Sequence, residues 1–199
     1  MTGAVAFLPG RWRYRMEHLV VVDCQYDFID GSLACAHSHE AVKYLVDFIN
    51  THDVVVDYTS DWHAPSNHSF KENGGIWPVH CVAGTHGAEL AEEFSKDVTD
   101  PAKQPSPENR FLKGTDDEVE EYSAFNGKNS EGVALGNVVS RHVYVGGIAS
   151  EYCVRETVLS LLAAGHIVTL LVPGLGYVSE KDHEKNLADL RQKGVMFIE

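Results

Sequence analysis

The sequence contains no apolar run long enough to cross a membrane. No stretch of the 199 residues approaches the roughly 20 consecutive apolar residues that a membrane-spanning helix requires. Basic residues are also scarce, since 16 Lys and Arg stand against 29 Asp and Glu, a net charge of −13. Because such a surface repels phosphate backbones and anionic lipids, we expect no nucleic-acid partner and no membrane association.

Cysteine is sparse and shows no paired spacing. The chain has four cysteines, at Cys24, Cys35, Cys81 and Cys153. A chain of this length buries about 70% of its unfolded surface, so its core needs no disulfide bonds. The pattern predicts free thiols and a reducing compartment, and hence a cytoplasmic protein.

The N-terminal residues do not resemble a secretory signal. A signal places its positive charge before a long apolar stretch, whereas here three arginines follow a short apolar patch at residues 4–8. Met16 stands just before the first expected strand, so we interpret residues 1–15 as an N-terminal extension or as the result of an alternative start, and we exclude them from the fold. The remaining length suits one domain, over residues 16–199.

Two kinds of apolar pattern alternate along the chain. Short β-branched runs predict buried strands, and longer stretches with helical spacing of apolar residues predict helices. The expected strands cover residues 18–23, 54–59, 142–146, 167–172 and 195–198, and the expected helices cover 39–50, 132–139, 150–164 and 181–193. This alternation predicts a Rossmann-like, three-layer α/β/α fold with a doubly wound, mostly parallel sheet.

Residues 60–128 interrupt this alternation. Irregular insertions of this length in a compact domain are usually functional. In an open α/β sheet, ligands bind outside the carboxyl ends of the strands. Three reactive side chains occur at such ends: Asp23 closes the first strand, Asp61 follows the second, and Cys153 begins the helix after residue 146.

Cys153 is a candidate nucleophile. Ser150 is a plausible helix N-cap, which would place Cys153 in the first helical turn. There, unpaired backbone amides and the helix dipole would lower the pKa of the thiol and stabilise a developing oxyanion. A small buried hydrophobic residue explains the same position equally well.

Asp23 is a candidate general base, because a partly desolvated carboxylate at a strand end can accept a proton. A capping aspartate is the more common role for such a residue. Lys113 would ordinarily be a surface lysine. It becomes relevant to catalysis if it is buried beside Asp23 and Cys153, where its charge would stabilise both groups as anions.

A candidate metal site follows the second strand. Asp61 and His63 point the same way in an extended segment, and His80 or His68 could complete the set. One carboxylate with two or three imidazoles suits zinc, iron(II) or manganese(II) and leaves positions open for water or substrate. A polar loop with scattered histidines would produce the same pattern.

Five short motifs occur in an order that resembles a known family. They are VDCQYDF at residues 22–28, DWH at 61–63, WPVHCVAGT at 77–85, KGTD with YSAF at 113–125, and GIASEYCV at 147–154. Together they resemble the nicotinamidases, of the pyrazinamidase type, in the isochorismatase-like cysteine hydrolase superfamily. The resemblance implies the isochorismatase-like fold, with residues 60–128 as a metal-binding insertion.

The resemblance assigns catalytic roles to particular residues of this sequence. It implies a catalytic triad of Asp23, Lys113 and Cys153. It implies a cis peptide bond between Ile148 and Ala149, and an oxyanion hole formed by the amides of Ala149 and Cys153.

The resemblance also implies how a metal ion and a substrate are held. The implied metal ligands are Asp61, His63 and His80, joined by a residue like His68 in some members. Phe28, Trp77 and Ile148 carry over as substrate-binding residues, and the two aromatic side chains could clamp a flat ring, although aromatic residues are more often simply core.

The implied reaction is hydrolysis of nicotinamide to nicotinate and ammonia in NAD salvage. It proceeds through a cysteine thioester, while one divalent metal, with zinc the first choice and iron or manganese the others, anchors the pyridine nitrogen. Pyrazinamide is an expected second substrate, and a homo-oligomer is left open. The alternatives are a related small-amide hydrolase or a non-catalytic metal-binding relative. The stretch at residues 172–177 departs from the family pattern and bears on substrate preference.

Overall fold

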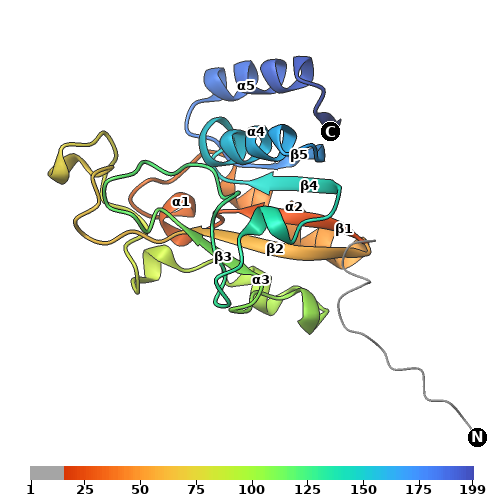
Figure 1. Cartoon of the computed structure of the whole chain (residues 1–199), viewed down its shortest axis with the longest axis horizontal. Helices are drawn as coiled ribbons and strands as arrows, with labels where there is room; N and C mark the ends of the chain where they lie inside the picture. The colour runs from red at the N-terminus through yellow and green to blue at the C-terminus, as the bar shows by residue number, and fades with distance from the viewer. Residues whose placement is uncertain (1–15) are drawn as a thin grey trace, which may run out of the picture.

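The computed structural model describes residues 16–199, so the extension predicted over residues 1–15 lies outside the described residues. One parallel sheet of six strands runs through the described chain (Figure 1). In sheet order the strands are β3 (Arg110–Lys113), β2 (Val54–Asp61), β1 (Glu17–Val22), β4 (His142–Gly147), β5 (Ile167–Leu175) and β6 (Met196–Ile198). The predicted doubly wound α/β fold is confirmed.

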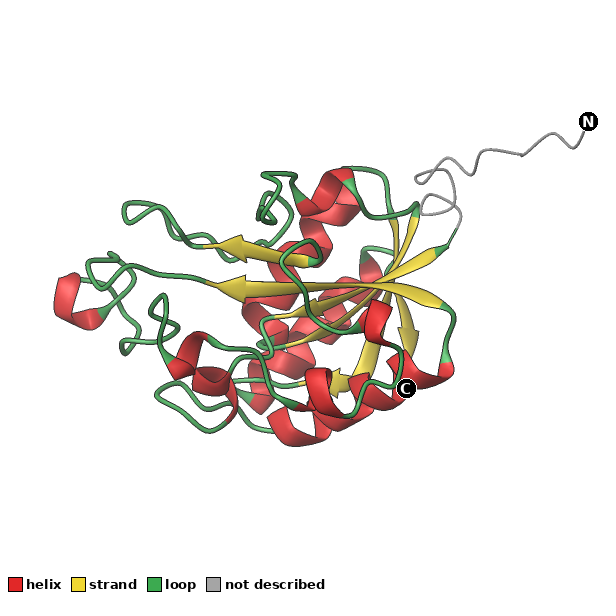
Figure 2. Ribbon diagram, turned by 90° about the horizontal axis from the view of Figure 1, so that it is seen from below, coloured by secondary structure: helices red, strands yellow, loops and turns green. Residues whose placement is uncertain are grey.

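Helices cover both faces of the sheet (Figure 2). Successive residues of a strand point to opposite faces, and β1 shows this directly. Leu19 and Val21 pack in the core under α2 (Ser38–Thr51), while Val20 and Val22 pack in the core under α4 (Arg155–Ala163) and α5 (Glu180–Gln192). Every residue of β1 after the first is therefore buried, which explains the uninterrupted apolar run at residues 19–22.

The strand order reverses between β1 and β4, which places the topological switch point at the centre of the sheet. The first parts of the long connections from β2 to β3 and from β3 to β4 lie at the left end of the sheet in Figure 1, where the strands end, whereas α3 lies below the sheet. Residues from these connections therefore lie beside the ends of β1 and β4.

The remaining elements are short. They are α1 (Tyr26–Ile29), α3 (Glu93–Lys96), a π-helical turn (Ser150–Val154), and 3-10 turns at Lys71–Asn73, His86–Ala88, Pro101–Lys103 and Leu135–Asn137. No helix within residues 16–199 is long and apolar enough to span a membrane.

Two segments differ from the sequence-based expectation. The helix predicted over residues 132–139 is only a 3-10 turn at Leu135–Asn137, because Gly132 and Gly136 weaken a helix of that length. The strand β3 was not predicted at all. Its apolar pair, Phe111 and Leu112, is too short to stand out, and pairing with β2 and the bridge to Lys128 stabilise it instead.

Candidate active site

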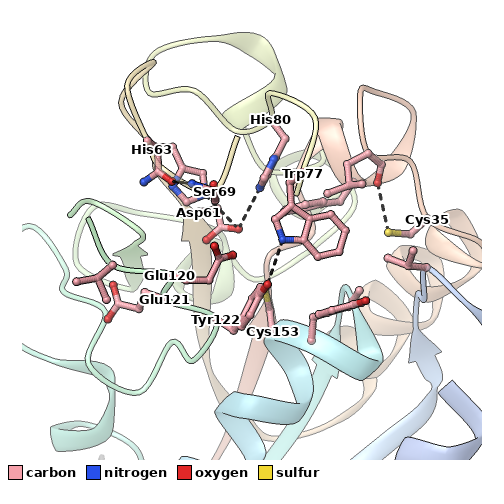
Figure 3. Close-up of a pocket in the computed structure, with 17 residues that line it drawn as sticks. Cys35, Asp61, His63, Ser69, Trp77, His80, Glu120, Glu121, Tyr122 and Cys153 are labelled. Carbon is pink, nitrogen blue, oxygen red and sulfur yellow. Dashed lines mark hydrogen bonds and ion pairs between the residues drawn. The ribbon is translucent and has the colours of Figure 1, made fainter. Parts of the chain in front are cut away.

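The carboxyl ends of the strands form one side of a pocket whose lining comes from several separate segments (Figure 3). The end of β2, the two long connections and the π-helical turn all contribute to it. Seven residues proposed from the sequence line this pocket: Phe28, Asp61, His63, Trp77, His80, Ala149 and Cys153.

Lys113 links three of the proposed residues. Its side chain is fully buried, and its Nζ lies 2.9 Å from Asp23 Oδ2 and 3.4 Å from Cys153 Sγ. The same Nζ also contacts Asp61 Oδ1. Burial alone would lower the pKa of Lys113, but the charges of Asp23 and Asp61 raise it well above its ordinary value. Lys113 is therefore a buried ammonium ion that contacts two carboxylates and a thiol.

Asp23 follows β1 with a left-handed φ of 46°. The Thr59 hydroxyl donates a hydrogen bond of 2.6 Å to its Oδ1 and fixes the carboxylate. Burial raises the pKa of Asp23, and the Lys113 charge opposes that rise. A buried carboxylate with a raised pKa accepts a proton more readily than a surface aspartate.

Cys153 lies in the π-helical turn that leads into α4. Burial raises the pKa of its thiol well above the ordinary value, although the Lys113 charge lowers it. The prediction of a lowered thiol pKa is therefore wrong, because the loss of solvent outweighs the nearby positive charge. The thiol keeps its proton until a neighbouring base accepts it.

Ser150 is not the helix cap that the sequence predicted. Ala149 occupies the N-cap position, and Ser150 is the first residue of the turn. The Ser150 hydroxyl lies 2.7 Å from His183 Nδ1, and the Ser150 backbone carbonyl accepts a hydrogen bond of 2.7 Å from Asn186 Nδ2. Both partners belong to α5, so this helix fixes the turn that carries Cys153.

The peptide bond between Ile148 and Ala149 is cis, as the resemblance implies. Gly147, just before it, has a φ of 129°, and a Cβ there would lie 2.0 Å from the Val22 carbonyl oxygen. Only glycine fits this close approach. Ala149 lines the pocket beside Cys153, whereas Ile148 is fully buried in the core and its side chain is not part of the lining.

Asp61, His63 and His80 form a compact cluster of buried donors. Their ligand atoms lie within 4.8 Å of one another, and the Nε2 atoms of His63 and His80 lie 3.7 and 4.0 Å from Asp61 Oδ2. Each histidine donates its Nδ1 hydrogen to a backbone carbonyl at 2.8 Å, that of Gly114 or of Pro78. Both Nε2 atoms are therefore left to bind a metal ion.

The chemistry of this cluster fits a divalent metal ion. Burial alone would raise the pKa of Asp61, but Lys113 and His63 lower it, so the carboxylate is ionised. Burial lowers the pKa of His80 and favours the neutral imidazole that binds metals. Ser69 Oγ, in the same pocket, is buried and has no hydrogen-bond partner within residues 16–199, as expected where a bound group would complete the site.

His68 lies outside this cluster. Its side chain is 58% exposed, and its Nδ1 lies 3.4 Å from Glu118 Oε2. The turn at residues 64–69 brings Asn67 and Ser69 to the pocket and leaves His68 at the surface. The structure therefore does not bring His68 to the proposed metal ligands.

Aromatic side chains from separate segments form the pocket wall. Trp77 Nε1 donates a hydrogen bond of 3.0 Å to the Tyr122 hydroxyl (Figure 3). The Tyr152 ring packs edge-on against Trp77 at 5.0 Å, and Phe28 packs against His80 at 5.4 Å. A flat, apolar-faced ring suits such a wall.

Several residues of this site were not found from the sequence, among them Thr59, Ser69, Tyr122 and Tyr152. Thr59 could have been predicted from the sequence, because it lies two residues before Asp61 and therefore on the same face of β2. Ser69 could not, because its position depends on the irregular turn that precedes it.

The family comparison covers nearly the whole described chain. The isochorismatase domain model matches residues 17–199, and the chain belongs to the isochorismatase domain family. Within it, the chain is similar to the nicotinamidase of Saccharomyces cerevisiae, with 32% identity over 79% of this chain and 86% of the relative. The family resemblance inferred from the motifs is confirmed.

Solved structures agree with this placement. Pyrazinamidase of Pyrococcus horikoshii in complex with zinc superposes with a TM-score of 0.79 at 32% identity, covering 92% of this chain and 99% of that one. PnC1 from L. infantum in complex with nicotinate superposes with a TM-score of 0.79 at 26% identity, covering 92% of both chains.

Proposed function

We propose that this chain is an amidohydrolase that converts nicotinamide to nicotinate and ammonia, and that it also deamidates pyrazinamide. The observation that carries the proposal is the contact of the buried Lys113 with Asp23, Asp61 and Cys153, the last two of which line the pocket. The similar proteins named nicotinamidase and pyrazinamidase support the choice of substrate.

The first half of the reaction forms a thioester. Asp23 accepts the thiol proton of Cys153, and the sulfur attacks the amide carbon. The backbone N–H groups of Ala149 and Cys153 stabilise the oxyanion of the tetrahedral intermediate. When the C–N bond breaks, Asp23 returns the proton to the leaving nitrogen, and ammonia departs.

The second half hydrolyses the thioester. Asp23 accepts a proton from water as the water oxygen attacks the same carbon. The C–S bond then breaks, and the proton on Asp23 returns to the sulfur of Cys153. The product leaves as nicotinic acid, which loses its remaining carboxyl proton to water and becomes nicotinate. Lys113 remains protonated throughout and stabilises the negative charge that alternates between the carboxylate and the sulfur.

Asp61, His63 and His80 would hold one divalent metal ion. Zinc is our first choice, because the similar Pyrococcus structure is described in complex with zinc, and the same donors suit iron or manganese. Such an ion supplies an open coordination position for the pyridine nitrogen of the substrate. Phe28 and Trp77 would hold the ring between them, which places the amide group at Cys153.

An ammonia-release assay tests this proposal. The purified protein, with its metal content measured by elemental analysis, is given nicotinamide, pyrazinamide and a panel of other small amides. We expect release from the two pyridine-like carboxamides to exceed release from aliphatic amides. A preference for an aliphatic amide would indicate a related amidase instead, and metal binding without any turnover would indicate a non-catalytic relative.

Two further assignments belong to the same proposal. A single domain over residues 16–199 is supported by the one continuous sheet and by the family match from residue 17. A cytoplasmic location is supported by the four cysteines, which are all free.

A further inference from the structure

The segment that joins β1 to α1 contacts both halves of the site. Asp23, at its start, pairs with Lys113. Two further residues of this segment form hydrogen bonds with backbone groups near the proposed metal ligands. Gln25 bonds to the backbone of Asp61, and Asp27 bonds to the backbone of Cys81, the residue after His80. Neither residue has a part in the reaction steps above.

The side-chain amide of Gln25 forms hydrogen bonds with both the N–H and the carbonyl of Asp61. Its Oε1 accepts a hydrogen bond from the Asp61 N–H, and its Nε2 donates one to the Asp61 carbonyl, each 2.8 Å long. The same Nε2 donates a second bond of 2.8 Å to the Ala88 carbonyl. Gln25 is fully buried, and all its strong hydrogen-bonding positions except one lone pair are therefore used.

The sheet cannot supply these contacts to Asp61. The pairing of β1 with β2 ends at Val21 and Tyr58, three residues before Asp61. On its other side, Asp61 is still in register with Lys113 of β3. The Gln25 side chain thus takes the place of the missing backbone neighbour.

Asp27 acts in the same way on the residue after His80. Its Oδ2 accepts a hydrogen bond of 2.7 Å from the Cys81 N–H. The Cys81 carbonyl in turn accepts a hydrogen bond of 3.0 Å from the His63 N–H. One carboxylate therefore fixes the point at which the two histidine-bearing segments meet.

We propose that Gln25 and Asp27 are positioning residues that set the metal affinity of the Asp61, His63 and His80 cluster. This inference rests on the metal site of the proposed function. The two residues hold the ligand backbone in the binding geometry without contacting the ion. Residues that orient ligands in this way typically change metal affinity by about 10- to 100-fold when they are replaced.

The test compares Gln25→Met with a matched control, Asn109→Leu. Asn109 is also buried, and its side chain also makes three hydrogen bonds to backbone groups, but at the opposite end of β3. Zinc affinity is measured by competition with a chromophoric chelator, with no substrate present. We expect Gln25→Met to weaken zinc binding by about 10- to 100-fold and Asn109→Leu to leave it unchanged, although both variants lose stability.

Asp27 provides a second, independent pair of variants. Asp27→Asn keeps an oxygen that can accept from the Cys81 N–H, so we expect it to retain parental zinc affinity. Asp27→Leu removes the acceptor, so we expect affinity to fall. This pair keeps the inference testable if Gln25→Met does not fold.

Three results would overturn the inference. They are parental zinc affinity in Gln25→Met and Asp27→Leu, an equal loss of affinity in Asn109→Leu, and a parent protein that takes up no zinc. A parent that binds zinc but releases no ammonia from nicotinamide would refute the proposed function alone. In that case the variants would still decide the inference.

Discussion

The two halves of the pocket are positioned by different means. The reacting half consists of Asp23, Lys113 and Cys153. Sheet pairing places Lys113 and the strand end before Asp23, and α5 fixes the turn that carries Cys153. In the metal half, only Asp61 lies on a strand. His63 and His80 lie in the long connection between β2 and β3, outside the ladder of the sheet.

The difference shows what an irregular segment needs in order to hold a precise site. Strand ends inherit their positions from neighbouring strands, as Lys113 does from its register with Asp61. The histidines depend on individual hydrogen bonds to the carbonyls of Gly114 and Pro78. We therefore expect changes in the two halves to separate chemistry from metal binding.

The largest expected effect comes from Cys153→Ala. Loss of the nucleophile should reduce ammonia release from nicotinamide by about 10⁴-fold or more, while the metal content stays parental, because the metal half is untouched. Cys35→Ala is the matched control, since Cys35 is a second buried thiol lining the same pocket. If Cys153→Ala still releases ammonia at a substantial rate, Cys153 is not the nucleophile.

His80→Ala should affect the metal half. Removing one of three ligands should lower metal occupancy and reduce kcat/KM by about 10²- to 10³-fold, because the substrate is no longer held in line with the thiol. His68→Ala, at an exposed histidine, should change neither quantity. Elemental analysis with steady-state kinetics measures both, and loss of metal in His68→Ala would show that His68 is a ligand after all.

Tyr122→Phe should have a smaller effect. It removes the hydrogen bond from Trp77 Nε1, worth about 1 kcal/mol, and should raise KM about fivefold with kcat nearly unchanged. Trp77→Phe removes the same bond and part of the ring contact. If the bond is the shared cause, the double variant should show less than the sum of the two effects. If the changes in KM of the two single variants add up fully in the double variant, the Trp77–Tyr122 hydrogen bond is not their shared cause.

The smallest effect concerns stability and pH. Burial lowers the pKa of His183 against the nearby charges of Glu180 and Glu184, and the His37 charge lowers it further. As the pH falls below the unfolded-state value of about 6.5, the unfolded chain binds a proton that the folded chain resists, so the free energy of unfolding decreases.

His183→Gln should remove this contribution, which is less than about 1.4 kcal/mol per pH unit. Denaturant unfolding of the parent and the variant at pH 7.5 and pH 5.5 measures the difference. An identical pH dependence in both proteins would show that His183 does not contribute.

Much of the fold followed from local patterns. The apolar runs that became β1, β4 and β5 stand out because buried parallel strands need continuous apolar sequence. The candidate residues Asp23, Asp61 and Cys153 followed from the rule that ligands bind at the carboxyl ends of such strands. β3 escaped prediction, because a four-residue edge strand ending in lysine has no distinctive periodicity.

The sequence by itself determined the α/β alternation, the ordered motifs and the set of residues able to carry the chemistry. Only the tertiary structure decided that Lys113 is buried between two carboxylates, that Ser69 rather than His68 faces the pocket, and that Gln25 holds Asp61. The reason is physical. Periodicity is a property of neighbouring residues, whereas these contacts join residues far apart in the chain and depend on how crossovers and irregular turns place them.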